Sequence, residues 1–433
     1  MHKFVINGGR PLSGEVKING AKNAILPVLA SCLLSEGECV FEQVPLLEDV
    51  FVMCEVLRHY GVTVIWQGDT LIVRPQNINN IQPPEQLMKK MRASNLILGP
   101  LLSCFGEVRL PFPGGCAIGS RPMNYHFRAL SQLGAEIYDQ GAYIHAKAEK
   151  LHGADICLDF PSVGATENAM MAAVKAEGQT IIYNAAREPE VVDLAAVLVG
   201  MGAKIQGAGG DIIYIEGVKK LGGLQHKVVR DRIEAGTMMI AAAITGGDIL
   251  LEDFEGTEAA ALIAKLKEAG VVTIPDARGL RVKGCPRVSG VDIRTMPYPG
   301  FPTDMQPQFM ALMATATGTA IIEESIFENR FRHAVEMRRM GADIKIIGEA
   351  AVIKGREAIT GAVVEATDLR AGAALVLLGL RAQGQTVVEN TEHIDRGYQC
   401  LEKTLRSLDA DISRSPMSEK TVALAELQLC TVS

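Results

Sequence analysis

The sequence has no C-x-x-C pair, although it contains nine cysteines. The cysteines are scattered, and none has the spacing of a zinc-ligand set. This pattern argues against structural zinc and against a scaffold stapled by disulfides. We therefore expect free thiols and a reducing cytoplasmic compartment, without disulfides or structural zinc.

Long apolar runs and an excess of positive charge are also missing. The most apolar run, Ala371 to Leu380, is ten residues long, and a membrane span needs about 20. Residues Met1 to Gly9 have no apolar signal-peptide core, so we expect no leader. The 43 basic and 50 acidic residues give a formal charge of −7. This balance argues against a general nucleic-acid surface, but a cleft can still gather cations for a small anionic substrate.

Aromatic residues are few, at 5% of 433 residues with one tryptophan, whereas hydrophobic residues reach 48% and glycines number 43. A chain of this length predicts two or three domains with an ample core. Many small residues favour closely packed helices and frequent tight turns.

A short phrase recurs six times, in which a glycine between apolar or small residues precedes the start of a strand. Its spacing, counted between the central residues, is 73, 68, 68, 71 and 68 residues. The copies are Tyr60-Gly61-Val62, Leu133-Gly134-Ala135, Met201-Gly202-Ala203, Ala269-Gly270-Val271, Met340-Gly341-Ala342 and Leu408-Asp409-Ala410. Aspartate in the last copy still tolerates the left-handed conformation that closes a helix. A repeat of this period predicts six similar structural units.

A second phrase keeps step with the first, in which a glycine ends an apolar segment and a short strand follows. The glycines are Gly37, Gly106, Gly178, Gly247, Gly318 and Gly384. The segments that begin each unit, such as Asn95–Leu102, Thr237–Ile244 and Ala373–Leu378, are apolar on all sides, which is typical of fully buried helices. We therefore predict an α/β fold in which helices fill the interior and sheets cover it, the inverse of the usual layering.

Six units divide naturally into two lobes of three. We expect the join near His226–Asp231, a polar stretch between units three and four. A cleft between two lobes is the default place for a ligand.

One loop carries an isolated thiol between glycines and prolines. It runs from Pro111 to Pro122 and contains Cys116, with Arg121 five residues later. Glycine and proline punctuate it as a loop that moves as a unit. A nearby cation lowers the pKa of a thiol and makes it more reactive. The alternative, from this segment alone, is an inert cysteine on a solvated loop.

Cations and amides open several of the predicted buried helices. Lys22 and Asn23 open the first, Arg92 the second, and Arg370 the sixth, while Arg396 follows His393-Ile394-Asp395. Helix N-termini and arginines together suit phosphate and carboxylate ligands. Each of these residues, taken singly, is also consistent with a solvated or capping role.

Asp304 follows a rigid Tyr298-Pro299-Gly300 turn. Thr303 or Asp304 could cap the next helix. Asp304 could instead serve as a general base or as an acceptor for a substrate hydroxyl.

With these patterns in hand, the chain resembles the UDP-N-acetylglucosamine enolpyruvyl transferases, also called 1-carboxyvinyltransferases. The resemblance covers nearly the whole chain, and its most specific part is the Gly-Gly-Cys loop. The matching phrases are Gly20–Ala24, Pro113–Gly119, Ser162–Asn168, Arg187–Asp193, Gly300–Gln306, Phe327–Phe331 and Asp395–Tyr398.

The resemblance implies an inside-out α/β barrel of two lobes, each made of three βαβαββ-type units. One lobe would comprise residues 22–229 with the Cys116 loop, and the other residues 1–21 and 230–433, with the active site in the cleft between them. The implied reaction is transfer of enolpyruvyl from phosphoenolpyruvate to the 3′-hydroxyl of UDP-N-acetylglucosamine. Phosphate leaves through an addition–elimination intermediate, and this is the first committed step of peptidoglycan synthesis. No nucleic acid, membrane span, metal, cofactor or obligate protein partner is implied.

The resemblance also implies roles for individual residues. Cys116 would be the general acid toward the enol carbon and would form an adduct with phosphoenolpyruvate. Lys22, Arg121 and Arg396 would clamp the phosphate and carboxylate of that substrate, Asp304 would face the reacting hydroxyl, and Asp368 would lie near the intermediate. The implied contacts to the sugar nucleotide are Asn23, Arg92, Arg121, Pro122, Met123, Asn124, Tyr125, Ser162, Val163, Gly164, Ile326 and Arg370.

Two positions depart from the family pattern. Asn124 stands where some members carry aspartate, and Phe160-Pro161 precede Ser162 where some members place a lysine. Both departures concern nucleotide affinity rather than the chemistry. The alternatives are enolpyruvyl transfer to shikimate 3-phosphate, or a non-catalytic paralogue that binds the nucleotide. The Gly-Gly-Cys loop argues against the first of these.

Overall fold

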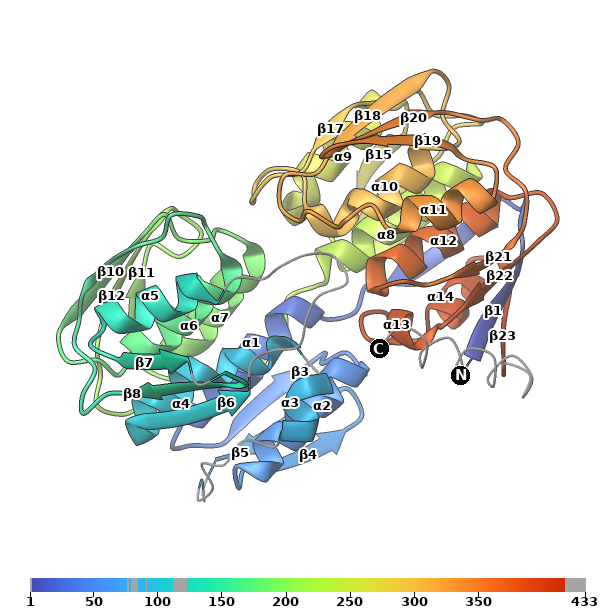
Figure 1. The fold of residues 1–433 in the computed structure, drawn as a ribbon. Helices are drawn as coiled ribbons and strands as arrows, with labels where there is room; N and C mark the ends of the chain where they lie inside the picture. Colours follow the sequence, from blue (N-terminus) through green and yellow to red (C-terminus); the bar gives the residue numbers. More distant parts are fainter. Residues whose placement is uncertain are drawn as a thin grey trace. The chain divides into compact units, whose positions relative to one another are not determined.

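The computed structural model describes residues 2–75, 78, 85–90, 92–111, 123–139 and 141–416 (Figure 1). These residues form two compact units. The amino-terminal unit comprises residues 19–111 and 123–231, and the carboxy-terminal unit comprises residues 2–18 and 232–416, within the described ranges.

Three sheets surround the helices of the amino-terminal unit. The first, in strand order, is β13 (Leu224–Lys227), β3 (Cys39–Glu42), β5 (Thr70–Arg74) and β4 (Thr63–Gln67). The second is β6 (Glu107–Pro111), β8 (Tyr143–Lys147) and β7 (Glu136–Asp139). The third is β11 (Lys204–Gln206), β12 (Ile212–Glu216), β10 (Gln179–Tyr183) and β9 (Asp155–Cys157). The helices are α1 (Lys22–Ser31), η1 (Cys32–Leu34), α2 (Glu48–His59), α3 (Glu85–Lys90), η2 (Arg92–Ile97), α4 (Leu98–Phe105), α5 (Asn124–Gln132), α6 (Val163–Ala173) and α7 (Pro189–Gly200).

The carboxy-terminal unit repeats this plan with three four-stranded sheets. The first is β15 (Val272–Asp276), β16 (Gly279–Lys283), β14 (Asp248–Glu252) and β2 (Ser13–Lys17). The second is β17 (Ile293–Arg294), β18 (Thr319–Glu323), β20 (Ala350–Lys354) and β19 (Asp343–Ile347). The third is β21 (Val363–Glu365), β22 (Gln385–Glu389), β1 (His2–Asn7) and β23 (Asp411–Pro416). The helices are α8 (Arg232–Thr245), η3 (Thr257–Ala259), α9 (Ala260–Glu268), η4 (Thr303–Met305), α10 (Gln306–Met313), α11 (His333–Arg339), α12 (Leu369–Arg381), α13 (Glu392–Asp395) and α14 (Leu401–Ser407).

The prediction that each recurring phrase is followed by a strand is confirmed. The second phrase precedes β3, β6, β10, β14, β18 and β22, and the first precedes β4, β7, β11, β15, β19 and β23. The divergent copy also conforms, because Asp409 adopts a left-handed φ of 72° where the other copies place glycine. The six predicted repeats are therefore present. Three lie in the amino-terminal unit and three in the carboxy-terminal unit.

Each four-stranded sheet combines one parallel pair with two antiparallel pairs. In the second sheet of the carboxy-terminal unit, β17 runs parallel to β18 with α10 between them in the chain. Strand β20 then pairs antiparallel with both β18 and β19. A parallel pair needs such a crossover, and the crossover helix covers one face of its sheet.

The helices that begin each unit are buried, as predicted. All residues of α12 from Arg370 to Leu380 are buried, and so are those of α8 from Ile233 to Thr245. Helices α8, α10 and α12 pack against one another and lie side by side in Figure 1. Full burial of one leucine, such as Leu375 of α12, stabilises the fold by about 1.5–3 kcal/mol. The inside-out arrangement of helices within sheets is thus observed in this unit.

The predicted second buried helix differs in one detail. The segment Asn95–Leu102 begins as the 3₁₀ helix η2 and becomes the α-helix α4 only at Leu98. Pro100 explains the change, because its missing N–H and its ring are incompatible with a regular α-helical turn just before it.

Strands β2 and β13 each pair with a strand from the other half of the sequence. Strand β2 precedes α1 in sequence but pairs with β14, while β13 precedes α8 but pairs with β3. The segments that follow these strands pair with each other, since the N–H of Ala21 donates to the carbonyl of Val229 at 2.7 Å. This pairing sets the start of α1, where Lys22 lies. Among the described residues, no helix combines the length and the apolar character that a membrane crossing requires.

Candidate active site

Lys22 is the first residue of α1 and is only 8% exposed. Its Nζ lies 2.7 Å from Oδ2 of Asp49, and its backbone N–H donates to Oδ2 of Asp231 at 3.2 Å. Both carboxylates are buried. A buried ammonium is costly unless it is paired. Lys22 therefore lies at the positive end of a helix, and its side chain forms a buried ion pair with Asp49.

Asn23 is the next residue and is the exception on α1. All the other residues of the helix, from Lys22 to Ser31, are buried, whereas Asn23 is exposed. An exposed amide in the first turn offers both a donor and an acceptor to a ligand.

Several predicted nucleotide contacts lie at the N-termini of helices α5 and α6. Asn124 is exposed at the first position of α5, and Met123 is buried just before it. Tyr125 is stacked on Phe160 with ring centroids 6.5 Å apart. Phe160, one of the departures from the family pattern, thus supports a predicted contact residue.

Ser162 caps α6, since its side chain accepts a hydrogen bond from the N–H of Ala165 at 3.4 Å. Val163 and Gly164 follow in the first turn and are half-buried. A Cβ on Gly164 would lie 3.1 Å from Cε1 of His126. Glycine at this position therefore permits the close packing of α5 on α6.

His126 and Asn168 join the segments that carry these residues. The Asn168 amide Nδ2 lies 3.0 Å from Nδ1 of His126 and donates to the carbonyl of Asn95 at 3.1 Å. Its Oδ1 accepts from the N–H of Gly99 at 2.8 Å. Because Nδ2 can only donate, Nδ1 of His126 is the acceptor and the ring is neutral. Burial lowers the pKa of His126 to about 4, in agreement with a neutral imidazole.

Asp304 lies in the 3₁₀ helix η4 and does not cap a helix. Pro302 and Met305 occupy the N-cap positions of η4 and α10, and neither helix has a side-chain cap. The capping interpretation is therefore wrong for Asp304. Its carboxylate is instead held by arginines, with 28% of the side chain exposed.

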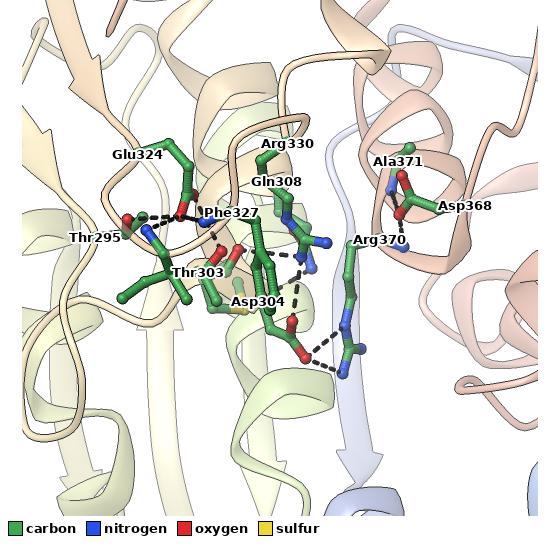
Figure 2. Close-up of polar contacts among 12 residues, drawn as sticks. Thr295, Thr303, Asp304, Gln308, Glu324, Phe327, Arg330, Asp368, Arg370 and Ala371 are labelled. Carbon is green, nitrogen blue, oxygen red and sulfur yellow. Dashed lines mark hydrogen bonds and ion pairs between the residues drawn. The ribbon is translucent and has the colours of Figure 1, made fainter. Parts of the chain in front are cut away.

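Two buried arginines share that carboxylate, as Figure 2 shows. Arg370 of α12 donates from Nε at 3.2 Å and from Nη2 at 3.0 Å to Oδ2 of Asp304. Arg330 donates from Nη2 to Oδ1 at 3.1 Å and to the carbonyl of Thr303 at 3.1 Å. Charge-assisted bonds of this kind are short and directional. The carboxylate is therefore held on both oxygens while part of it faces outward.

Tyr398 contacts Arg370 on the buried side of this cluster. Its hydroxyl accepts a bond from Nη1 of Arg370 at 3.2 Å and from Nε2 of Gln308 at 3.2 Å. All three side chains are buried. These bonds stabilise the orientation of the Arg370 side chain.

Asp368 is the N-cap of α12, accepting bonds from the N–H groups of Arg370 at 2.9 Å and Ala371 at 3.0 Å. Loss of such a cap costs about 1 kcal/mol. The cap fixes the start of the helix that carries Arg370. Arg396 is half-buried at the end of α13. The preceding Asp395 forms an ion pair with Arg414 at 2.5 Å.

Ile326 lies in the turn after β18. Its N–H donates to Oε1 of Glu324 at 2.9 Å, and Thr303 donates its hydroxyl to the other oxygen of the same carboxylate at 3.0 Å. The turn that carries Ile326 is therefore linked to the segment that carries Asp304.

Several predicted residues lie outside the described part of the chain. These are Cys116, Arg121 and Pro122, together with the side chain of Arg92, whose backbone lies in η2. Among the described residues, no group of three or more histidine, cysteine, aspartate or glutamate side chains could hold a metal ion.

The carboxy-terminal unit thus brings together Asp304, Arg370, Asp368 and, through Glu324, Ile326. In the amino-terminal unit, Lys22 and Asn23 share one helix turn, and the α5 and α6 residues share a second cluster. Sequence reasoning missed Arg330, Asp49 and Glu324. Arg330 belongs to a phrase that was noted, but nothing in its spacing indicated an ion pair with Asp304, 26 residues away.

The comparisons with known proteins agree with one another. A profile of the family described as EPSP synthase (3-phosphoshikimate 1-carboxyvinyltransferase) matches residues 6–405. The chain is 53% identical over 412 residues to UDP-N-acetylglucosamine 1-carboxyvinyltransferase 1 of Caldanaerobacter subterraneus subsp. tengcongensis, covering 95% of this chain and 99% of that protein. It is 52% identical to the protein of the same name from Carboxydothermus hydrogenoformans, covering 97% of this chain and 100% of that protein.

Solved structures share the fold. The enolpyruvyl transferase NikO from Streptomyces tendae is similar with a TM-score of 0.88 at 24% identity, covering 96% of this chain and 99% of that chain. The EPSP synthase from Acinetobacter baumannii is similar with a TM-score of 0.74 at 19% identity, covering 96% of this chain and 100% of that chain.

Proposed function

Since this chain belongs to the family of the UDP-N-acetylglucosamine 1-carboxyvinyltransferases, it transfers enolpyruvyl from phosphoenolpyruvate to UDP-N-acetylglucosamine in peptidoglycan synthesis, and we propose which of its residues do so. The 3′-oxygen of the sugar bonds to C2 of phosphoenolpyruvate while C3 gains a proton. In the second step C3 loses a proton, the bond between C2 and the phosphate oxygen breaks, and phosphate leaves.

Asp304 faces the reacting hydroxyl in this proposal. The observation that supports it is a carboxylate held by two buried arginines with 28% of its side chain still exposed. The two guanidinium groups stabilise the negative charge, so the carboxylate is available to accept a hydrogen bond from the substrate hydroxyl. Such an acceptor orients the oxygen for attack and takes up its proton as the new bond forms.

Lys22, Arg121 and Arg396 bind the phosphate and carboxylate of phosphoenolpyruvate. Lys22 supports this role by its place at the positive end of α1. Fixed cations stabilise the charge that moves onto phosphate as it leaves. Asp368 lies close to the intermediate, on the helix that carries Arg370.

The sugar nucleotide is bound by the N-terminal turns of three helices and by residues from the other unit. Asn23, Arg92, the segment 121–125, Ser162, Val163, Gly164, Ile326 and Arg370 form this set. The helix N-termini of α1, α5 and α6 support it, because backbone N–H groups and the helix dipole there favour a diphosphate.

Cys116 donates the proton to C3. We place the enzyme in the cytoplasm, on the cysteine pattern of the sequence.

The test is phosphate release from phosphoenolpyruvate, with and without UDP-N-acetylglucosamine. We expect release only with the sugar nucleotide, and use of shikimate 3-phosphate instead would overturn the choice of acceptor. Nucleotide binding without phosphate release would identify a binding-only paralogue.

A reactive thiol makes a further prediction for the same assay. We expect Cys116→Ala to lower turnover near pH 7 by at least about 100-fold, as for loss of a general acid. Mass spectrometry should find Cys116 alkylated by a small epoxide phosphonate such as fosfomycin in the presence of the sugar nucleotide. Cys157→Ala, at an exposed cysteine of the same unit, is the matched control and should keep full activity. An unmodified Cys116 would count against a reactive thiol.

A further inference from the structure

Glu324 is a buried carboxylate one residue beyond the end of β18. It is 3% exposed, yet no lysine or arginine neutralises it in the hydrogen bonds of the described residues around it. A buried carboxylate is costly unless donors surround it. Here four donors do so, two backbone N–H groups and two threonine hydroxyls (Figure 2).

The two oxygens of Glu324 bind different segments of the chain. Oε1 accepts from the N–H of Ile326 at 2.9 Å, the N–H of Phe327 at 3.2 Å and the hydroxyl of Thr295 at 2.9 Å. Oε2 accepts from the hydroxyl of Thr303 at 3.0 Å. The first oxygen therefore fixes the turn after β18, and the second reaches the residue next to Asp304.

Arg330 closes this connection from the other end of the turn. Its Nη2 donates to the carbonyl of Thr303 and to Oδ1 of Asp304, both at 3.1 Å. The segment from Glu324 to Arg330 thus contacts the Thr303–Asp304 segment at both of its ends. A closed ring of hydrogen bonds restrains its members more strongly than the same bonds in an open chain.

We propose that Glu324 is a positioning residue, which holds Asp304 and the turn at Ile326 in one fixed relation by its bond to Thr303. The inference rests on the proposed role of Asp304 toward the acceptor hydroxyl. In that role, Ile326 contacts the nucleotide and Asp304 contacts the sugar of the same substrate. A rigid link between the two contacts sets where the 3′-oxygen lies relative to the carboxylate, and small errors in that position are costly to the rate.

A pair of isosteric variants separates this role from simple stabilisation. Thr303→Val and Thr295→Val each remove one hydroxyl that donates to Glu324. Thr295 also accepts from the N–H of Ser325 at 2.9 Å, so its variant loses more hydrogen bonds. Only the Thr303 variant removes the hydrogen bond between Glu324 and the segment that carries Asp304.

We expect Thr303→Val to lower kcat by about tenfold or more and to raise KM for UDP-N-acetylglucosamine, with KM for phosphoenolpyruvate unchanged. Thr295→Val should keep kcat within about twofold while showing the larger fall in Tm, because it removes both the bond to Glu324 and the bond from the N–H of Ser325. Thr303→Ser should restore kcat, since it keeps the hydroxyl.

Glu324→Gln is the second variant, in case Thr303→Val folds poorly. Its carbonyl can still accept from the two N–H groups, while its amide faces Thr303 in place of the carboxylate oxygen. We expect the same fall in kcat to a smaller degree, with Tm near that of the unmodified protein.

Two results would separate the possible failures. If Thr303→Val and Thr295→Val lower kcat in proportion to their losses of Tm, Glu324 is structural only and the positioning role is overturned. If Asp304→Asn keeps the unmodified kcat, the proposed role of Asp304 fails instead, and the positioning role fails with it.

Discussion

The amino-terminal unit places its candidate residues at the N-termini of three helices, whereas in the carboxy-terminal unit the carboxylate of Asp304 is held by ion pairs with two arginines. In the first unit, Lys22 begins α1, Asn124 begins α5 and Ser162 caps α6. In the second unit, Asp304 is held by Arg330 and Arg370, which come from different segments. The two units share a repeated fold but present opposite chemistry.

In the proposed function, the difference follows from what each unit would bind. Helix N-termini supply N–H donors and positive potential, which suit phosphate groups. The carboxylate of Asp304, which we propose faces a hydroxyl, is instead fixed at both oxygens by a pair of arginines. The six repeats therefore provide a scaffold, and the residues at the ends of the buried helices decide what each unit does.

The largest effect is expected in the amino-terminal unit, at the ion pair of Lys22 with Asp49. Lys22→Met removes a proposed phosphoenolpyruvate contact and leaves Asp49 buried without its cation. We expect kcat/KM for phosphoenolpyruvate to fall by about 100-fold or more. We also expect the free energy of unfolding to fall by about 3–5 kcal/mol, as when one partner of a buried pair is removed.

A double variant separates these two losses. Lys22→Met with Asp49→Leu should recover most of the stability in urea denaturation, because no unpaired charge stays buried. It should not recover kcat/KM. If activity returned with stability, Lys22 would be a structural residue and the comparison between the units would lose its basis.

A smaller effect is expected in the carboxy-terminal unit, where each arginine makes a different number of bonds to Asp304. Arg370 donates two and Arg330 donates one. Arg370→Lys keeps the charge but loses the planar fork, so we expect kcat to fall by about tenfold. For Arg330→Lys we expect a smaller fall in kcat.

The matched control is Arg356→Lys in the same unit, which changes an exposed ion pair with Asp343 and should leave kcat unchanged. Steady-state kinetics and circular dichroism of the three variants provide the comparison. Equal rates for Arg370→Lys and the control would contradict a shared clamp on Asp304.

The smallest effect concerns pH and compares one buried histidine in each unit. Burial lowers the pKa of His126 in the amino-terminal unit to about 4, and burial also lowers the pKa of His333 in the carboxy-terminal unit. Below the unfolded value of 6.5, the unfolded chain binds a proton that the folded chain refuses. Stability is therefore complete above that value and falls as the pH drops toward 4.

For His126 this linkage amounts to about 2 kcal/mol between pH 7 and pH 5, at roughly 1.4 kcal/mol for each pKa unit. His126→Gln has no proton to bind, so its free energy of unfolding in urea should depend less on pH by that amount. His333→Gln is the corresponding variant of the other unit. An unchanged pH dependence in His126→Gln would contradict a lowered pKa of His126 in the folded protein.

Much of the fold was predictable because it depends on local rules. The glycine phrases mark strand starts through backbone conformation alone, and Asp409 obeys the same rule with its left-handed φ. The buried helices were predictable because segments such as Ala373–Leu378 have no polar face. The 3₁₀ start of η2 was missed, although Pro100 carried the signal for it.

The candidate site was predictable only in part. Residues such as Lys22, Asn23 and Ser162 were indicated by their place at the start of an apolar segment or by the family resemblance. Their partners were not, because Asp49, Arg330 and Glu324 follow no spacing rule toward Lys22 and Asp304. The capping interpretation of Asp304 failed for the same reason, since a cap is a local bond and the bonds of Asp304 are long-range.

The sequence by itself determined the six-unit plan, the inside-out arrangement of its helices and the family to which the chain belongs. These features depend on backbone conformation, on apolar periodicity and on phrases that can be read over a few residues. Only the tertiary structure decided that Asp304 lies between two arginines and that Lys22 has Asp49 as its partner. A buried charge must find its counter-charge in three dimensions, and the chain brings that partner from another segment.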